Sequence, residues 1–150
     1  MSPTPETLRE PAPRRVVLDS FAVLAYLQDE PGGRVVLDLL QQAERGALEL
    51  HMSVINLGEV VYRVTRAYGE DRLRMVLGEL HAHPITLHDV DERLAMTAAS
   101  IKAMYPMAFA DCVAAALARH LSAELATGDP ELRQIDGYPP LLWLPSPARA

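Results

Sequence analysis

Short apolar runs alternate with stretches of helical periodicity along most of the chain. Aliphatic runs that end in turn or cap residues predict five strands, at 15–18, 48–52, 84–87, 124–127 and 141–144. Apolar residues recur at spacings of three and four in the segments between them. These segments predict helices at 21–29, between Gly33 and Gly46, and at 54–68, 70–82, about 90–104 and 109–120. Strands that alternate with helices in this way predict an α/β sandwich around a mostly parallel sheet.

Local signals set the ends of these elements. Ser20 and Ser53 are predicted N-caps, and Gly46 and Gly69 are predicted to end helices. Four prolines before residue 14 predict a flexible arm over 1–14, and 145–150 is a predicted flexible tail. The interpretation is therefore a single domain over residues 15–144.

Composition narrows the class of protein. The chain has 150 residues, of which 49% are hydrophobic, so one core can be buried without disulfides. Cys112 is the single cysteine, and the N-terminus lacks a signal-like apolar segment, which together favour a cytoplasmic location. No apolar run approaches the roughly 18 residues that span a bilayer, so we expect no membrane role.

Four acidic residues stand at positions that a parallel sheet would bring together. Asp19 directly follows the first predicted strand, and Asp129 lies just past the fourth. Glu59 lies inside the third helix, and Asp111 lies in the first turn of the sixth, among Ala, Val and Leu. Since ligands of such folds bind beyond the carboxyl ends of the strands, we expect these acids to share one edge of the sheet.

Each acid alone also has an ordinary explanation, as a helix cap, a solvated helix face or a turn residue. Together, four carboxylates would repel one another, and a desolvated carboxylate at Asp111 needs a compensating charge. Mg²⁺ or Mn²⁺ supplies that charge and prefers oxygen ligands. A metal-activated water could then attack a phosphodiester. We therefore expect Asp19, Glu59, Asp111 and Asp129 to be the metal-binding and catalytic residues.

Four stretches of the chain carry a family resemblance. They are VVLDSFAVLAYL at 16–27, SVINLGEV at 53–60, ADCVAAALA at 110–118 and ATGDPEL at 126–132. In order and spacing the sequence resembles the PIN-domain nucleases, specifically the VapC-type toxins of toxin–antitoxin pairs. The resemblance covers residues 15–144.

The resemblance implies a PIN fold and a Mg²⁺- or Mn²⁺-dependent endoribonuclease. It further implies a homodimer that is held inactive by a cognate antitoxin. Asp19, Glu59 and Asp111 would be the main metal ligands, and Asp129 would complete the site. The residues in supporting positions would be Asn56, Thr127 and Ser20.

Two positions depart from the family pattern. Phe21 stands where many relatives carry a small polar residue, and this ring crowds the expected site. Ala108 stands where a Ser or Thr often caps the helix of the third acid, which weakens that cap by about 1 kcal/mol. Neither departure removes a carboxylate.

The net charge of −6 argues against a general nucleic-acid binder, which usually has a basic face. Positive charge for RNA must therefore be local. Arg63 and Arg66 in the third helix are candidates for contacts with the RNA backbone. Arg72 and Arg74 in the fourth helix and Lys102 before the sixth helix add further positive charge. Ordinary solvated helix faces are the alternative explanation.

Two other functions and one other metal site are alternatives. The acids also fit a non-catalytic PIN-like binding module for protein or RNA. A phospho-acceptor domain of receiver type would require a second acid beside Asp19 and a Lys after a late strand, whereas Lys102 falls in a predicted helix. A zinc site at His81, His83 and His88 is disfavoured by irregular spacing and by the lack of a partnering cysteine.

Overall fold

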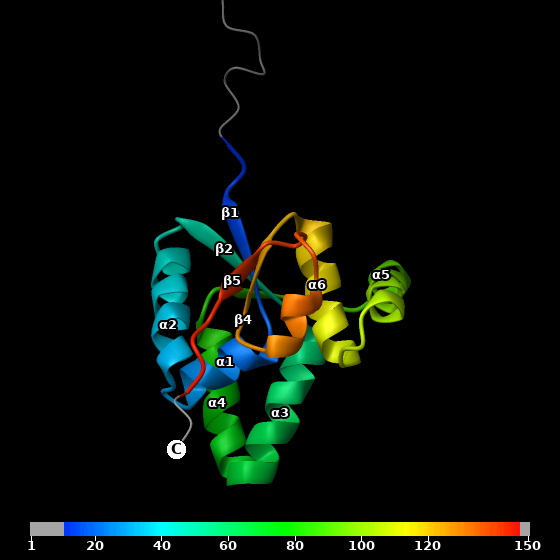
Figure 1. Ribbon diagram of the computed structural model, residues 1–150. Coiled ribbons are helices and arrows are strands. Elements are labelled where there is room, and N and C mark those ends of the chain that lie inside the picture. Colours follow the sequence, from blue (N-terminus) through cyan, green and yellow to red (C-terminus); the bar gives the residue numbers. More distant parts are fainter. Residues whose placement is uncertain (1–10, 148–150) are drawn as a thin grey trace, which may run out of the picture.

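The computed structural model describes residues 11–147, and its five strands form one entirely parallel sheet. The strands are β1 (Arg14–Leu18), β2 (Leu48–Ser53), β3 (Ile85–His88), β4 (Glu124–Thr127) and β5 (Leu141–Trp143). Their order across the sheet is β3-β2-β1-β4-β5, so the first strand lies at the centre (Figure 1). The predicted α/β sandwich is confirmed, and the sheet is more regular than the expected mostly parallel one.

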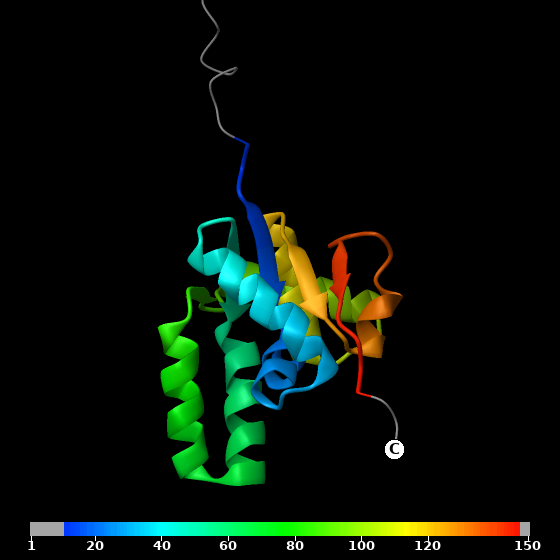
Figure 2. The ribbon, with the colours of Figure 1, turned by 90° about the vertical axis from the view of Figure 1, so that its left-hand side faces the viewer.

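Helices connect the strands and cover the sheet. They are α1 (Ser20–Leu27), α2 (Pro31–Glu44), α3 (Val54–Tyr68), α4 (Glu70–Ala82), α5 (Glu92–Met104), α6 (Phe109–Leu121) and the 3-10 helix η2 (Pro130–Gln134). Figures 1 and 2 show α3 and α4 as a hairpin that extends beyond the ends of the strands. The short helix η2 was not expected, because its segment was interpreted as a turn.

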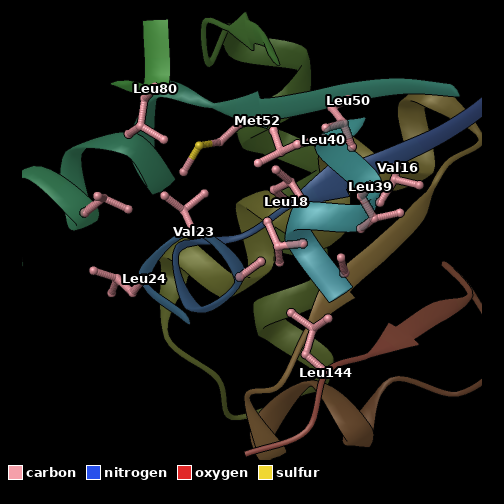
Figure 3. Close-up of a cluster of buried hydrophobic side chains, with 14 of the residues drawn as sticks. Val16, Leu18, Val23, Leu24, Leu39, Leu40, Leu50, Met52, Leu80 and Leu144 are labelled. Carbon is pink, nitrogen blue, oxygen red and sulfur yellow. The ribbon is translucent and has the colours of Figure 1, made fainter. Parts of the chain in front are cut away.

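Successive side chains of the central strand β1 point to opposite faces of the sheet, and each face has its own hydrophobic core. Val16 and Leu18 face one core, where Leu50 of β2 meets Leu39 and Leu40 of α2 (Figure 3). Between them, Val17 faces the opposite core, which is formed mainly with α5 and α6. Because successive side chains of a strand point to opposite faces, the continuous apolar run 16–18 is what a strand covered on both faces requires.

Helix starts follow the sequence with two corrections. The helix expected after Gly33 begins earlier, at Pro31 of α2, because proline is tolerated in the first turn of a helix. Ser53 caps α3, as predicted, by accepting a hydrogen bond from the Asn56 amide. The predicted cap at Ser20 is wrong: Asp19 is the N-cap of α1, and Ser20 is its first helical residue. The helix spans Ser20–Leu27 instead of 21–29. It starts at Ser20 because Asp19 Oδ1 accepts the Ala22 amide at 2.8 Å, and it ends early because Gln28 is the C-cap and Asp29 has a φ of +52°. The first acid is thus fixed by the helix that it begins.

Residues 1–10 and 148–150 lie outside the described part of the chain, and so do most of the predicted arm and half of the predicted tail. β1 begins at Arg14, the last residue assigned to the arm. Within residues 11–147, no single helix is long and apolar enough to cross a membrane. Only α5 and α6 taken together, across a bend of 119°, reach that length and composition.

Candidate metal centre

Asp19 lies buried at the carboxyl end of the central strand. Only 1% of its surface is exposed, and its backbone is extended between β1 and α1. Its Oδ1 accepts the Ala22 amide, whereas its buried Oδ2 has no hydrogen-bond donor among the described residues. A buried carboxylate oxygen without a donor is costly, so this atom calls for a cation or a proton.

Thr127 and Asp129 lie beside it at the end of the neighbouring strand. Thr127, at the end of β4, is fully buried, and its Oγ1 accepts the Asp129 amide at 3.1 Å. Asp129 is the N-cap of η2, and its Oδ1 accepts the Glu131 amide at 3.0 Å. These contacts fix the turn that carries the fourth acid.

Asp111 enters the same site from the first turn of α6. Only 6% of it is exposed, as its apolar neighbours predict. The Asn56 side-chain amide holds this turn to α3 by donating to the Ala110 carbonyl at 3.2 Å. Asn56, expected as a supporting residue of the site, is fully buried and forms part of the core.

Glu59 approaches from α3 and is held by α1. Its Oε1 accepts a hydrogen bond from the Ser20 hydroxyl. Its Oε2 lies 3.8 Å from Arg63 Nη2, one turn further along α3. The hydroxyl that sequence reasoning assigned to a helix cap therefore orients an acid of the site.

Glu131 is a fifth acid that the sequence did not single out. One ligand oxygen from each of Asp111, Asp129 and Glu131 lies within 4.8 Å of the others. Glu131 Oε2 also accepts the Ala108 amide at 3.3 Å, so it serves the start of α6, where a Ser or Thr cap is missing. The only local signal was an acid two residues after Asp129.

Glu59, Asp111, Asp129 and Glu131 border an open pocket of about 500 Å³, whereas the buried Asp19 is not among its lining residues. Among the described residues that line it, Arg63 is the only Lys or Arg. Arg66 does not line it, and its guanidinium lies 5.7 Å from the centre of the Tyr62 ring. Figure 1 shows α1, α3 and the first turn of α6 meeting below the ends of β1 and β4.

Burial and mutual repulsion favour the protonated forms of two acids. Burial raises the pKa of Asp19 to about 7, and the charges of Asp129 and Glu59 act in the same direction. Burial is also the main cause that raises the pKa of Asp111, and the charges of Asp129 and Asp19 raise it further. Without a cation, the site therefore disfavours the ionised forms of Asp19 and Asp111.

The donor set fits a hard divalent cation. Carboxylate oxygens are the ligands that Mg²⁺ and Mn²⁺ prefer, and the oxygens that converge within 4.8 Å belong to Asp111, Asp129 and Glu131. Asp19, whose buried Oδ2 lacks a donor, lies outside this group of three but is near enough for its charge to raise the pKa of Asp111. The histidines considered for zinc do not converge. His88 pairs with His51 at 2.8 Å, and His83 contacts the Tyr26 hydroxyl at 3.2 Å.

The receiver-type alternative also lacks its lysine. Lys102 Nζ donates to the Met107 carbonyl at 2.5 Å, at the turn between α5 and α6. It therefore has a structural contact next to α6 and does not line the pocket.

The fold and this acid-lined pocket define a family. The chain belongs to the PIN domain family, whose model matches residues 16–138. No curated protein sequence matches the chain.

Solved structures share the fold at low identity. A toxin–antitoxin complex from Klebsiella pneumoniae matches with a TM-score of 0.63 and 16% identity, covering 85% of this chain and 95% of that one. A DNA-bound VapBC from Salmonella typhimurium matches with a TM-score of 0.64 and 18% identity, covering 83% and 94%. VapC20 of Mycobacterium tuberculosis, a sarcin-ricin loop cleaving toxin, matches with a TM-score of 0.62 and 14% identity, covering 79% and 93%.

Proposed function

We propose that this protein is a Mg²⁺- or Mn²⁺-dependent endoribonuclease that acts as the toxin of a toxin–antitoxin pair. The observation that carries the proposal is the buried Asp19 Oδ2, which lacks a donor beside three further acids from separate elements. Membership of the PIN family and the likeness to VapC20, an RNA-cleaving toxin, support it.

The proposed cation ligands are Asp19, Glu59, Asp111 and Asp129, and Glu131 is a further candidate because its carboxylate converges with those of Asp111 and Asp129. A bound divalent cation would stabilise negative charge on a phosphodiester and lower the pKa of an attacking water. Ser20 orients Glu59, and Thr127 fixes the turn of Asp129. The acidic side chains of the site are thus oriented by hydrogen bonds from neighbouring residues.

Arg63 is the proposed contact for an RNA phosphate outside the acids. It lines the pocket, and 56% of its side chain is exposed, so its guanidinium can exchange Glu59 for a ligand. The contact is tested by the salt dependence of RNA binding: Arg63→Ala should reduce the slope of log affinity against log salt by about one. Arg74→Ala, on exposed α4 and paired with Asp71, is the control. Equal slopes for wild type and Arg63→Ala would reject the contact, and Arg66→Ala tests the second candidate in the same way.

The activity itself is tested with structured and single-stranded RNAs in Mg²⁺ or Mn²⁺. Cleavage should stop with EDTA and with Asp19→Asn. Cleavage that survives both treatments would contradict a metal-carboxylate mechanism, and no cleavage of any RNA would favour the non-catalytic binding module.

An antitoxin is the proposed protein partner, as in the toxin–antitoxin complexes that share the fold. An excess of acids over one Arg63 in the pocket suits a basic side chain of such a partner. The protein encoded by an adjacent small gene, mixed with this chain, should suppress RNA cleavage. Light scattering on the purified chain tests the homodimer that the family resemblance suggests.

A further inference from the structure

Among the described residues that line the pocket, Phe21 is the one with an aromatic ring. Phe21 lies in the first turn of α1, is half-buried, and lines the pocket together with Glu59, Asp111 and Asp129. It therefore presents an apolar face next to the acids that would bind a scissile phosphate.

The Phe21 ring occupies the space beside Gly128, the residue before the fourth acid. A Cβ built at Gly128 would overlap the Phe21 ring. The φ of Gly128 lies outside the left-handed region, so its backbone does not itself require glycine. Space for the Phe21 ring is what excludes a side chain at this position.

Packing alone does not account for this arrangement. The inner side of Phe21 packs against the core between the sheet and α1 to α4, but the residue keeps an exposed part that faces the pocket. Leu24, one turn further along α1, also lines the pocket and is 92% buried, with 8% of its surface exposed. A buried plug would need no exposed ring.

We propose that Phe21 forms a base-stacking subsite, which holds one base of the RNA beside the scissile phosphate. The inference rests on the proposed function and adds a binding position to it. Bases stack on exposed aromatic rings with little sequence preference, because every base has a π-face. The flanking acids repel the backbone except where a cation binds it, so an apolar platform is where the adjacent base gains contact. Phe21 is a positioning residue for the substrate.

A double-mutant cycle that combines a substitution of Phe21 with an abasic site in the RNA tests the subsite. In an RNA that the wild-type protein cleaves, an abasic site is placed in turn at each position flanking the cleaved bond. One position should lower kcat/KM by about 10-fold in wild type. In Phe21→Leu the intact RNA should lose a similar factor, and the abasic site should then have little further effect.

Matched variants separate stacking from damage to the pocket. Phe21→Tyr retains a ring and should retain the abasic effect. Leu24→Ala changes the pocket wall without removing a ring and should retain it too. Gly128→Ala should displace the Phe21 ring, so its cleavage rate and its response to the abasic site should match those of Phe21→Leu. In a protein that already carries Phe21→Leu, the further change Gly128→Ala should alter the cleavage rate little.

The outcomes are distinguishable. If the wild-type protein cleaves no RNA in Mg²⁺ or Mn²⁺, both the proposed function and the subsite are overturned. If it cleaves RNA and the abasic penalty is the same in wild type and Phe21→Leu at every position, only the stacking subsite is overturned.

Discussion

Ser20 donates its hydroxyl hydrogen to Glu59, so the residue that follows the first acid of the site holds the second acid in place. The two residues lie in different helices, 39 positions apart, and the contact joins α1 to α3. Partners that orient metal ligands typically change metal affinity or activity by 10- to 100-fold when they are removed.

Ser20→Ala should therefore weaken Mn²⁺ binding by roughly 10-fold, measured by calorimetric titration. Loss of the hydroxyl leaves Glu59 with only the longer contact to Arg63. Ser20→Thr keeps a hydroxyl and is the control that should bind nearly as wild type does. An affinity of Ser20→Ala within twofold of wild type would show that Glu59 needs no such partner.

Asp19→Asn should stabilise the protein in EDTA, and more so at high pH. The unfolded chain has an Asp pKa near 4, whereas burial raises the pKa of folded Asp19 to about 7. Between these values the folded state binds more protons, so ionisation of Asp19 costs stability progressively as pH rises from about 4 through 7. The asparagine carries no charge and can still accept the Ala22 amide.

The measurement is urea unfolding of both proteins in EDTA at pH 5.5 and 8.5. We expect Asp19→Asn to exceed wild type at pH 8.5 by on the order of 1–3 kcal/mol, with a smaller gain at pH 5.5. With excess Mn²⁺ the order should reverse, because only wild type has the full ligand set. A variant that is less stable than wild type in EDTA at pH 8.5 would contradict the buried, unpartnered carboxylate.

Glu131→Gln should weaken Mn²⁺ binding, because Glu131 places a carboxylate oxygen within 4.8 Å of ligand oxygens of Asp111 and Asp129. Roughly 10-fold is expected, with the fold unchanged in circular dichroism. Glu70→Gln, an exposed acid in the first turn of α4, is the matched control for loss of one negative charge. If the two substitutions weakened Mn²⁺ binding equally, Glu131 would contribute only through the net charge of the protein and not as a ligand.

Two glycines in helices should respond in opposite ways to alanine. A Cβ at Gly33 of α2 would lie 2.5 Å from the Ala25 carbonyl oxygen and 3.0 Å from Tyr26 Cα. Both are backbone atoms of α1. Gly33→Ala should destabilise the protein by about 1–3 kcal/mol, since α1 and α2 must separate. Gly78 of α4 has open space around it, so Gly78→Ala should stabilise by up to about 1 kcal/mol. Thermal unfolding of both variants checks this, and two shifts of the same sign would contradict the close approach of α1 and α2.

Local signals predicted the elements best. The third helix was predicted at its observed bounds, because Ser53 and Gly69 both act through their own backbone neighbours. Ser20 and Asp19 illustrate the limit of such signals. Both are good N-caps, and only the packed structure decides that Asp19 caps the helix while Ser20 turns to Glu59.

The rest of the site depends on contacts between distant segments. Glu131 lies in a proline-initiated turn with no periodic pattern, and its place beside Asp111 arises because η2 meets the start of α6 at Ala108. Asn56 was expected to support the site only because of the family resemblance, and its buried contact with the Ala110 carbonyl could not be read from the sequence. Neither partner is adjacent in sequence, so spacing along the chain does not reveal the contact.

Acidic residues from four elements of this fold are proposed to form one binding site for a divalent cation. Anomalous diffraction from a crystal of the protein soaked in Mn²⁺ tests it most directly. The account predicts a manganese peak within ligand distance of the Asp19 and Asp111 carboxylates, absent in Asp19→Asn. A soaked crystal with no peak at these carboxylates, or with manganese bound only elsewhere, would contradict it.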